Sequence, residues 1–84
     1  MIYDFKKVLI TGGAGTIGLP LTDELISRGI DVVVFDLNEQ IERLESFINK
    51  KAIKFSGSVL DSAALRDAMS DCDGVIHLAA HLGV

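Results

Sequence analysis

The stretch Thr11-Gly12-Gly13-Ala14-Gly15-Thr16-Ile17-Gly18 follows a short apolar run, residues 8–10, and precedes an amphipathic segment that extends to Arg28. This order predicts a strand, a glycine-rich turn and a helix. The first N–H groups of a helix have no partner within the helix and carry partial positive charge, so they attract anions. Glycines let a phosphate group approach the backbone closely. The stretch therefore predicts a phosphate-binding turn, with an ordinary tight strand-to-helix turn as the alternative.

The rest of the chain alternates between strand-like and helix-like patterns. Strands are expected at residues 6–11, 31–36, 52–56 and 74–79, and helices at 16–28, 39–49 and 62–69. Such alternation predicts right-handed βαβ units, because parallel neighbouring strands need a helical crossover between them. We therefore expect an α/β chain, a partial Rossmann fold with a four-stranded parallel sheet of order 3-2-1-4 and helices on both faces.

Helix ends and buried positions follow from local chemistry and helical spacing. We expect Asn38 to cap the second helix and either Asp61 or Ser62 to cap the third. Pro20 is expected in the first helical turn, and Gly29 at the left-handed position that ends that helix. The Lys50-Lys51 pair is expected to close the second helix. Predicted inward residues are Ile17, Leu21, Leu25 and Ile26 in the first helix, Ile41, Leu44 and Ile48 in the second, and Leu65 and Met69 in the third.

Composition limits the class of protein. The 84 residues, 49% hydrophobic and 24% charged, are those of one soluble globular domain or less. The net charge of −4 argues against nucleic acid or an anionic membrane as the main partner. One cysteine, Cys72, allows no internal disulfide, and with two histidines it supplies no zinc-site spacing. No apolar stretch has the length of a membrane span, and we expect a cytoplasmic protein.

Asp36 ends the second predicted strand and follows Gly18 by 18 positions. Dinucleotide-binding folds place an acidic residue there to bind the adenosine ribose hydroxyls. A carboxylate at this position repels a 2′-phosphate, and residues 37–42 contain no lysine or arginine to compensate. The pattern therefore favours NAD over NADP, whereas Asp36 by itself is also typical of an ordinary loop start.

Together these motifs resemble the extended short-chain dehydrogenase/reductase family, the group of NAD-dependent nucleotide-sugar epimerases and dehydratases. The resemblance covers residues 6–84 and is carried by Thr11-Gly12-x-x-Gly15-x-x-Gly18, Asp36, Gly57-x-x-x-Asp61 and His77-Leu78-Ala79-Ala80. It implies that residues 1–84 form the N-terminal part of an NAD(P)-binding Rossmann domain. The implied activity is that of an epimerase or dehydratase acting on a nucleotide sugar, with this part holding NAD.

The resemblance also implies a set of cofactor contacts. The backbone of residues 15–17 would face the pyrophosphate, residues 58–59 would flank the adenine, and residues 78–80 would run beside the cofactor on its nicotinamide side. The family usually has aspartate where this chain has Ser58, whose uncharged hydroxyl makes a weaker acceptor for the adenine amino group. The full implied set is Gly12, Gly15, Thr16, Ile17, Gly18, Asp36, Asn38, Ser58, Val59, Leu78, Ala79, Ala80 and His81.

No catalytic residue is assigned from the sequence. The family uses a Tyr-x-x-x-Lys pair on a later helix, whereas Tyr3 precedes the first predicted strand and Lys7 lies near its start. His77 is expected to be a hydrogen-bonded core histidine. His81 follows the fourth strand, at the edge where α/β sheets bind ligands. We therefore expect no turnover from these residues alone.

Two other functions fit parts of the pattern. A non-catalytic NAD(P)-binding or redox-sensing module needs no catalytic tyrosine. A methyltransferase also has an acidic residue after its second strand, but the glycine spacing argues against that class. The fourth predicted strand carries Val75, Ile76 and Leu78 with no lysine or proline to protect its edge, which predicts a possible homo-oligomer through that edge.

Overall fold

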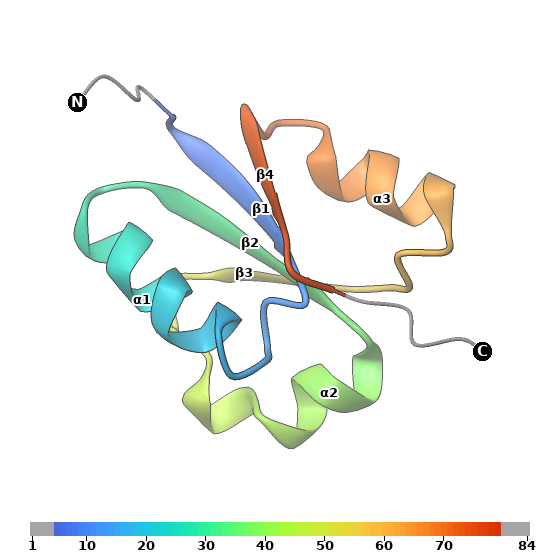
Figure 1. The fold of residues 1–84 in the computed structure, drawn as a ribbon, viewed down its shortest axis with the longest axis horizontal. Coiled ribbons are helices and arrows are strands. Elements are labelled where there is room, and N and C mark those ends of the chain that lie inside the picture. Colours follow the sequence, from blue (N-terminus) through green and yellow to red (C-terminus); the bar gives the residue numbers. More distant parts are fainter. Residues whose placement is uncertain (1–4, 80–84) are drawn as a thin grey trace.

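A single parallel sheet with helices on both of its faces organises the computed structural model, which describes residues 5–79 (Figure 1). The strand order is β3-β2-β1-β4, and every neighbouring pair is parallel, as predicted. The elements in chain order are β1 (Lys7–Thr11), α1 (Gly18–Ser27), β2 (Asp31–Asp36), α2 (Asn38–Arg43), the 3-10 turn η1 (Glu45–Phe47), β3 (Ile53–Ser56), α3 (Ser62–Met69) and β4 (Gly74–His77).

The two central strands, β1 and β2, are apolar at every position between their terminal residues, because both faces of the sheet are covered. Val32 and Val34 of β2 pack on the face covered by α1 and α2, whereas Val33 and Phe35 pack on the face covered by α3. Figure 1 shows α1 and α2 on one side of the sheet and α3 on the other. A strand covered on both faces must be apolar in both alternating sets of side chains. Across the α3 face, the rings of Phe35 and Phe55 stack with centroids 5.7 Å apart.

Helix α1 begins two residues later than predicted. Ile17, predicted to point inward, precedes α1 and is 66% exposed. Thr22 occupies the buried position on this helix instead. Pro20 is in the first turn, where its missing N–H removes no intrahelical bond, and Gly29 ends the segment at φ +83°, both as predicted.

The prediction that Asn38 caps the second helix was wrong. Asn38 is already the first residue of α2, and the backbone carbonyl of Leu37 accepts from the N–H groups of Gln40 and Ile41. The Asn38 side chain instead donates to Glu42 Oε2 at 3.3 Å, one turn along the exposed surface. The helix starts one residue earlier than predicted because the carbonyl oxygen of Leu37, a residue in extended conformation, is the first acceptor of its hydrogen bonds.

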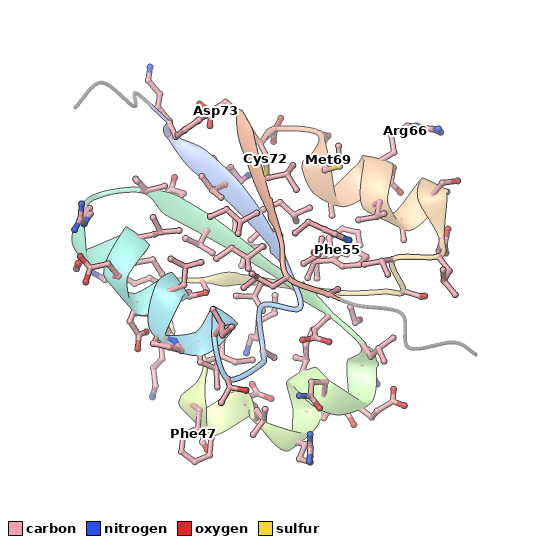
Figure 2. All side chains as sticks on the ribbon, in the orientation of Figure 1. Phe47, Phe55, Arg66, Met69, Cys72 and Asp73 are labelled. Atoms are coloured by element: carbon pink, nitrogen blue, oxygen red, sulfur yellow. The ribbon has the colours of Figure 1, made fainter. Side chains whose placement is uncertain are left out.

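The second helix is also shorter than predicted, because α2 ends at Arg43 and the chain continues as η1. The Lys50-Lys51 pair therefore does not close a helix. Ile41 and Ile48 are both buried as predicted, but Ile48 is reached through an extended backbone rather than a helical turn. Phe47 is 66% exposed and points away from the sheet in Figure 2.

Helix α3 has the expected cap. Asp61, one of the two predicted candidates, accepts hydrogen bonds from the N–H groups of Ala63 and Ala64 at 3.1 and 3.2 Å. Leu65 packs on the sheet as predicted, but Met69 is 41% exposed and Ala68 is buried in its place. A small side chain allows the end of α3 to lie close to the sheet, which leaves the larger methionine at its margin (Figure 2).

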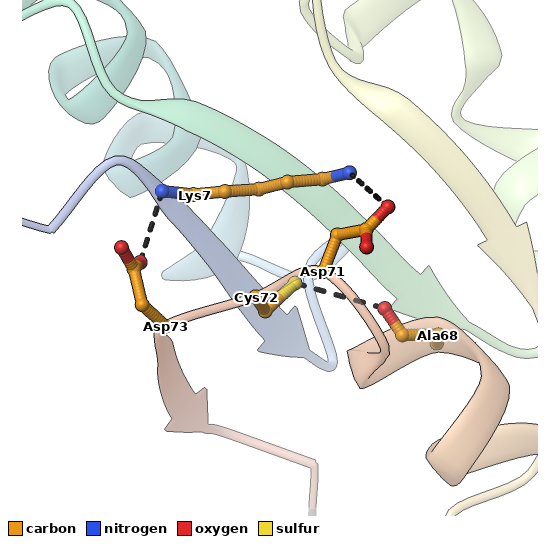
Figure 3. A network of polar contacts seen from close by, with 5 residues as sticks. All are labelled: Lys7, Ala68, Asp71, Cys72 and Asp73. Carbon is orange, nitrogen blue, oxygen red and sulfur yellow. Dashed lines mark hydrogen bonds and ion pairs between the residues drawn. The ribbon is translucent and has the colours of Figure 1, made fainter.

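Strand β4 ends at His77, two residues before its predicted end, and Asp73 fixes its beginning. The Asp73 carboxylate accepts from the backbone N–H groups of Lys6 and Lys7 at 3.0 to 3.2 Å. These hydrogen bonds hold the pKa of Asp73 below its ordinary value. In return, the Asp73 N–H donates to the Lys7 carbonyl at 2.9 Å, so the starts of β1 and β4 are joined here (Figure 3).

Among the described residues, no helix has both the length and the apolar character needed to cross a membrane.

Candidate functional site

The glycine turn lies at the carboxyl end of β1 and is tied to the end of β2. The N–H groups of Gly12 and Gly13 both donate to the Phe35 carbonyl, at 2.8 and 3.3 Å. Gly12 has φ +70°, and a Cβ added there would lie 2.8 Å from the Ala79 backbone nitrogen. A side chain at this position is therefore excluded both by backbone conformation and by space.

The remaining two motif glycines differ in what surrounds them. A Cβ at Gly18 would lie 2.6 Å from the Gly13 Cα atom, so Gly18 is required for α1 to pack against the turn. A Cβ at Gly15 would meet only the Gly12 carbonyl oxygen, at 3.3 Å. The space beside Gly15 is not filled by the protein, which leaves its backbone open to a ligand.

Asp36 contacts the turn directly. Its Oδ2 accepts from the Ala14 N–H at 3.0 Å and its Oδ1 accepts from the Leu37 N–H at 2.8 Å. A carboxylate has about four acceptor positions, so these two bonds leave capacity for the hydroxyl groups of a ligand. The side chain is therefore held in one orientation and can still accept hydrogen bonds.

Two adjoining hollows flank the turn. The glycine-turn hollow, about 270 Å³, is lined by Gly12, Gly15, Thr16, Ile17, Gly18, Asp36 and Leu78. The Ser58 hollow, about 220 Å³, is lined by Gly12, Phe35, Asp36, Leu37, Gly57, Ser58, Val59, Leu60 and Ala79. Both hollows include Gly12 and Asp36, so they meet at these residues. One part of their combined shape lies beside the start of α1, where free helix N–H groups attract anions, and the other part lies beyond β2 and β3, where Phe35, Val59 and Leu60 contribute to its wall.

The segment after β4 is anchored through Thr11. The Leu78 N–H donates to the Thr11 carbonyl at 3.0 Å, and the Ala79 N–H donates to Thr11 Oγ1 at 3.3 Å. Thr11 Oγ1 also lies 2.7 Å from His77 Nδ1. His77 is thus hydrogen-bonded as predicted, but it is exposed rather than in the core.

The structure brings together most of the predicted cofactor residues that it describes. Asn38 is the exception, because its exposed side chain lines neither hollow. Ala80, His81 and Tyr3 lie outside the described residues. Sequence reasoning missed Leu37 and Leu60, which line the Ser58 hollow and are both exposed. An exposed leucine directly after a strand or within a loop is the signal that would have indicated them.

A larger cavity, about 940 Å³, lies at the opposite end of the sheet between α1 and β4. Its walls include Phe5, Leu25, Ile30 and Ile76, at or near the starting ends of the strands. Ligands of α/β sheets bind outside the carboxyl ends of the strands, so size alone does not identify the site.

Cys72, at this same opposite end, has the environment of a structural residue. Its Sγ lies 3.6 Å from the Ala68 carbonyl oxygen, in the network of Figure 3. Partial burial raises the pKa of the Cys72 thiol, so the reactive thiolate is disfavoured at neutral pH.

Comparisons with known proteins give a consistent result. The model of the NAD dependent epimerase/dehydratase family matches residues 8–84. A UDP-glucose 4-epimerase of Erwinia amylovora is 40% identical in an alignment 80 positions long, which covers 87% of this chain and 24% of that enzyme. A UDP-N-acetyl-alpha-D-glucosaminuronate decarboxylase of Bacillus cytotoxicus is 39% identical in an alignment 84 positions long, which covers 94% of this chain and 25% of that enzyme.

Solved structures agree with the sequence relatives. An epimerase of Methanothermobacter thermautotrophicus superimposes with a TM-score of 0.78 at 36% identity, over 94% of this chain and 24% of that one. A UDP-glucose 4-epimerase of Bifidobacterium longum, solved in complex with NAD⁺ and UDP, gives a TM-score of 0.73 at 32% identity, over 90% and 25% of the two chains. The chain thus spans about a quarter of the length of the relatives it matches.

Proposed function

Since the chain belongs to the NAD-dependent epimerase/dehydratase family, we propose that it binds NAD(H) in the two adjoining hollows at the carboxyl edge of its sheet. One observation carries the proposal: the glycine-turn hollow and the Ser58 hollow meet at Asp36, between a helix N-terminus and an apolar recess. The groups of a dinucleotide follow one another in a matching order: an anionic pyrophosphate for the helix N-terminus, a ribose with two hydroxyls for Asp36, and a flat adenine for the recess.

Each part of the proposed cofactor has a matching set of groups. The backbone of residues 15–17, at the start of α1, would bind the pyrophosphate, and the free acceptor positions of Asp36 would bind the adenosine ribose. Ser58 and Val59 would flank the adenine, with Leu37 and Leu60 extending its apolar wall. Leu78 and Ala79, together with Ala80 and His81 further along the chain, would lie toward the nicotinamide.

Asp36 also supports a preference for NAD over NADP. Its carboxylate would repel a 2′-phosphate group, and both of its oxygens are already held in place by backbone N–H groups. Because the side chain cannot turn away without losing these bonds, the repulsion would persist.

For the whole protein we propose an NAD-dependent epimerase or dehydratase that acts on a nucleotide sugar, with residues 1–84 as the N-terminal part of its Rossmann domain. Bound NAD supplies reversible hydride transfer in such chemistry. The residues described here would bind and orient the cofactor. They include no Tyr-x-x-x-Lys pair, and we propose that this chain alone has no turnover.

The proposal is tested by calorimetric titration of the chain with NAD⁺ and, separately, with NADP⁺. We expect saturable binding of one NAD⁺ per chain and weaker binding of NADP⁺. The matched variants are Asp36→Asn at the site and Asp31→Asn, an exposed aspartate at the other end of the same strand. Loss of NAD⁺ affinity in Asp36→Asn alone supports the proposal. No binding of NAD⁺ by a chain that is folded by circular dichroism would overturn it.

A further inference from the structure

Ala14, in the middle of the glycine turn, is completely buried, and both of its backbone polar groups are held by side chains. Its N–H donates to Asp36 Oδ2 at 3.0 Å, and its carbonyl oxygen accepts from Gln40 Nε2 at 3.3 Å. Asp36 ends β2, and Gln40 is in the first turn of α2. The turn is therefore fixed from two different elements that follow each other in the chain.

The Gln40 side chain is itself oriented by a neighbour. Arg43 donates a hydrogen bond from its guanidinium group to Gln40 Oε1. A guanidinium group can only donate, so the oxygen of the Gln40 amide must face Arg43 and its NH₂ group must face Ala14. Two successive hydrogen bonds thus connect Arg43 to Gln40 and Gln40 to the carbonyl group of Ala14.

Holding this carbonyl fixes the peptide group that follows it. In a trans peptide the Ala14 carbonyl and the Gly15 N–H belong to one plane and point in opposite directions. With the carbonyl turned toward α2, the Gly15 N–H points into the turn and donates to the Gly12 carbonyl at 3.1 Å. Gly15 lines the glycine-turn hollow, whereas Ala14 and Gln40 do not. The negative end of the peptide dipole is therefore directed away from the hollow.

We propose that Gln40 is a positioning residue for the phosphate-binding turn, because it holds the Ala14 carbonyl oxygen away from the place of a dinucleotide pyrophosphate. The inference rests on the proposed NAD site. Without Gln40, the Ala14 carbonyl has no side-chain donor, and the Ala14–Gly15 peptide can rotate its oxygen toward the phosphates. The effect is specific to ligands that contain a pyrophosphate, because the Ser58 hollow does not involve Ala14.

The test compares Gln40→Met, which keeps the length of the side chain without its hydrogen bonds, with Glu42→Gln, an exposed change on the same helix. Affinities for NAD⁺ and for adenosine are measured by NMR titration of each variant and of the parent chain. One hydrogen bond corresponds to about a three- to tenfold change in affinity. We expect Gln40→Met to lose about that factor for NAD⁺, with adenosine affinity unchanged. Glu42→Gln should match the parent for both ligands.

Other outcomes would contradict the proposal in distinguishable ways. Equal NAD⁺ affinity in the parent and in folded Gln40→Met overturns the role of Gln40 and leaves the NAD site standing. A parallel loss of NAD⁺ and adenosine affinity shows a general structural role and also overturns it. If the parent chain binds adenosine but not NAD⁺, or neither, the proposed function fails, and this inference fails with it.

Discussion

At the scale of single residues, Gly15 and Gly18 should have different roles: Gly15 in ligand binding and Gly18 in the stability of the fold. In Gly15→Val, the added Cβ has only one near neighbour, the Gly12 carbonyl oxygen at 3.3 Å, and the backbone φ is not positive. We expect this variant to fold and to lose NAD⁺ binding, because its side chain would fill the space of the pyrophosphate. Calorimetry with NAD⁺, alongside thermal unfolding, measures both properties.

Gly18→Ala is the matched variant on the other side of the turn. Its Cβ would lie 2.6 Å from backbone atoms of Gly13, which cannot move without displacing the turn. We expect a loss of about 1–3 kcal/mol in the free energy of unfolding, the usual cost of overpacking. Urea denaturation of this variant gives the value. A Gly18→Ala chain as stable as the parent would mean that α1 does not pack this tightly.

Asp36 should control the choice between NAD and NADP. In Asp36→Ala, both a ribose hydrogen bond and a repulsive charge disappear, so we expect the ratio of NAD⁺ to NADP⁺ affinity to fall about tenfold or more. The substitution also removes the acceptor of the Ala14 N–H, which should lower the affinity for NAD⁺ and for NADP⁺ alike. The ratio of the two affinities is therefore the quantity that reports on Asp36. An unchanged ratio would show that Asp36 is not the ribose ligand; Asp31→Ala is the control.

The sequence predicted the motif residues because their constraint is local. Glycine spacing after an apolar run and an acidic residue at the end of the next strand can be read directly from the chain. The positions of Ile17 and Asn38 could not be predicted in this way, because each depends on which backbone carbonyl accepts the first hydrogen bond of a helix. A shift of one or two residues in that choice exposes Ile17 and replaces Asn38 as a cap.

At the scale of elements, α1 carries a buried hydroxyl group without a partner. Thr22 is 1% exposed, and its Oγ1 makes no hydrogen bond with any residue that the structure describes. Thr22→Val keeps the shape and removes the unpaired group, so we expect the free energy of unfolding to rise by about 1 kcal/mol. Thermal unfolding should show a midpoint about 4–8 °C higher. The control Thr16→Val, at an exposed position, should change the midpoint little. If Thr22→Val is less stable than the parent, the hydroxyl has a hydrogen-bond partner, such as buried water.

The junction of β1 and β4 should make stability depend on pH. The pKa of Asp73 is lowered in the folded state by the N–H groups of Lys6 and Lys7, so its contribution is complete above the ordinary aspartate pKa of about 3.9. The contribution is lost as the pH falls through the lower folded-state pKa.

We therefore expect the difference in unfolding free energy between the parent and Asp73→Asn to be largest at neutral pH and to shrink below about pH 4. Urea titrations at several pH values measure it. Asp71→Asn is the control, because Asp71 is exposed and its carboxylate is 3.9 Å from Lys7 Nζ, at the limit of an ion pair. A pH-independent difference would assign the effect of Asp73→Asn to shape rather than charge.

The kinds and order of elements were predictable, whereas their ends were not. Buried strands are recognisable in the sequence as short apolar runs, and amphipathic helices by the helical spacing of their apolar residues. All four predicted strands and three predicted helices are present. The interruption between α2 and η1 cannot be recognised from the spacing of apolar residues. Ile41 and Ile48 are both buried, as a continuous helix would also require, and only their packing against the sheet decides the path between them.

For the molecule as a whole, β4 forms one of the two edges of the described sheet, and two of its four residues are exposed. It pairs only with β1, and Val75 is 47% exposed. An unprotected edge next to an apolar surface promotes association. We expect the 84-residue chain to be marginally stable or to form oligomers through β4. Light scattering with thermal unfolding measures both properties, and Val75→Lys should shift the chain toward the monomer. A strictly monomeric parent with a high, cooperative midpoint would contradict this.

The central claim is that a dinucleotide binds at the carboxyl edge of the sheet and not in the larger cavity at the other end. The most direct measurement is the change in backbone amide NMR shifts when NAD⁺ is added to the isotopically labelled chain. The claim predicts changes at residues 12–18, 36–37, 58–60 and 78–79, with none at residues 29–30 and 74–76. Changes confined to residues 29–30 and 74–76, around the larger cavity, would contradict it.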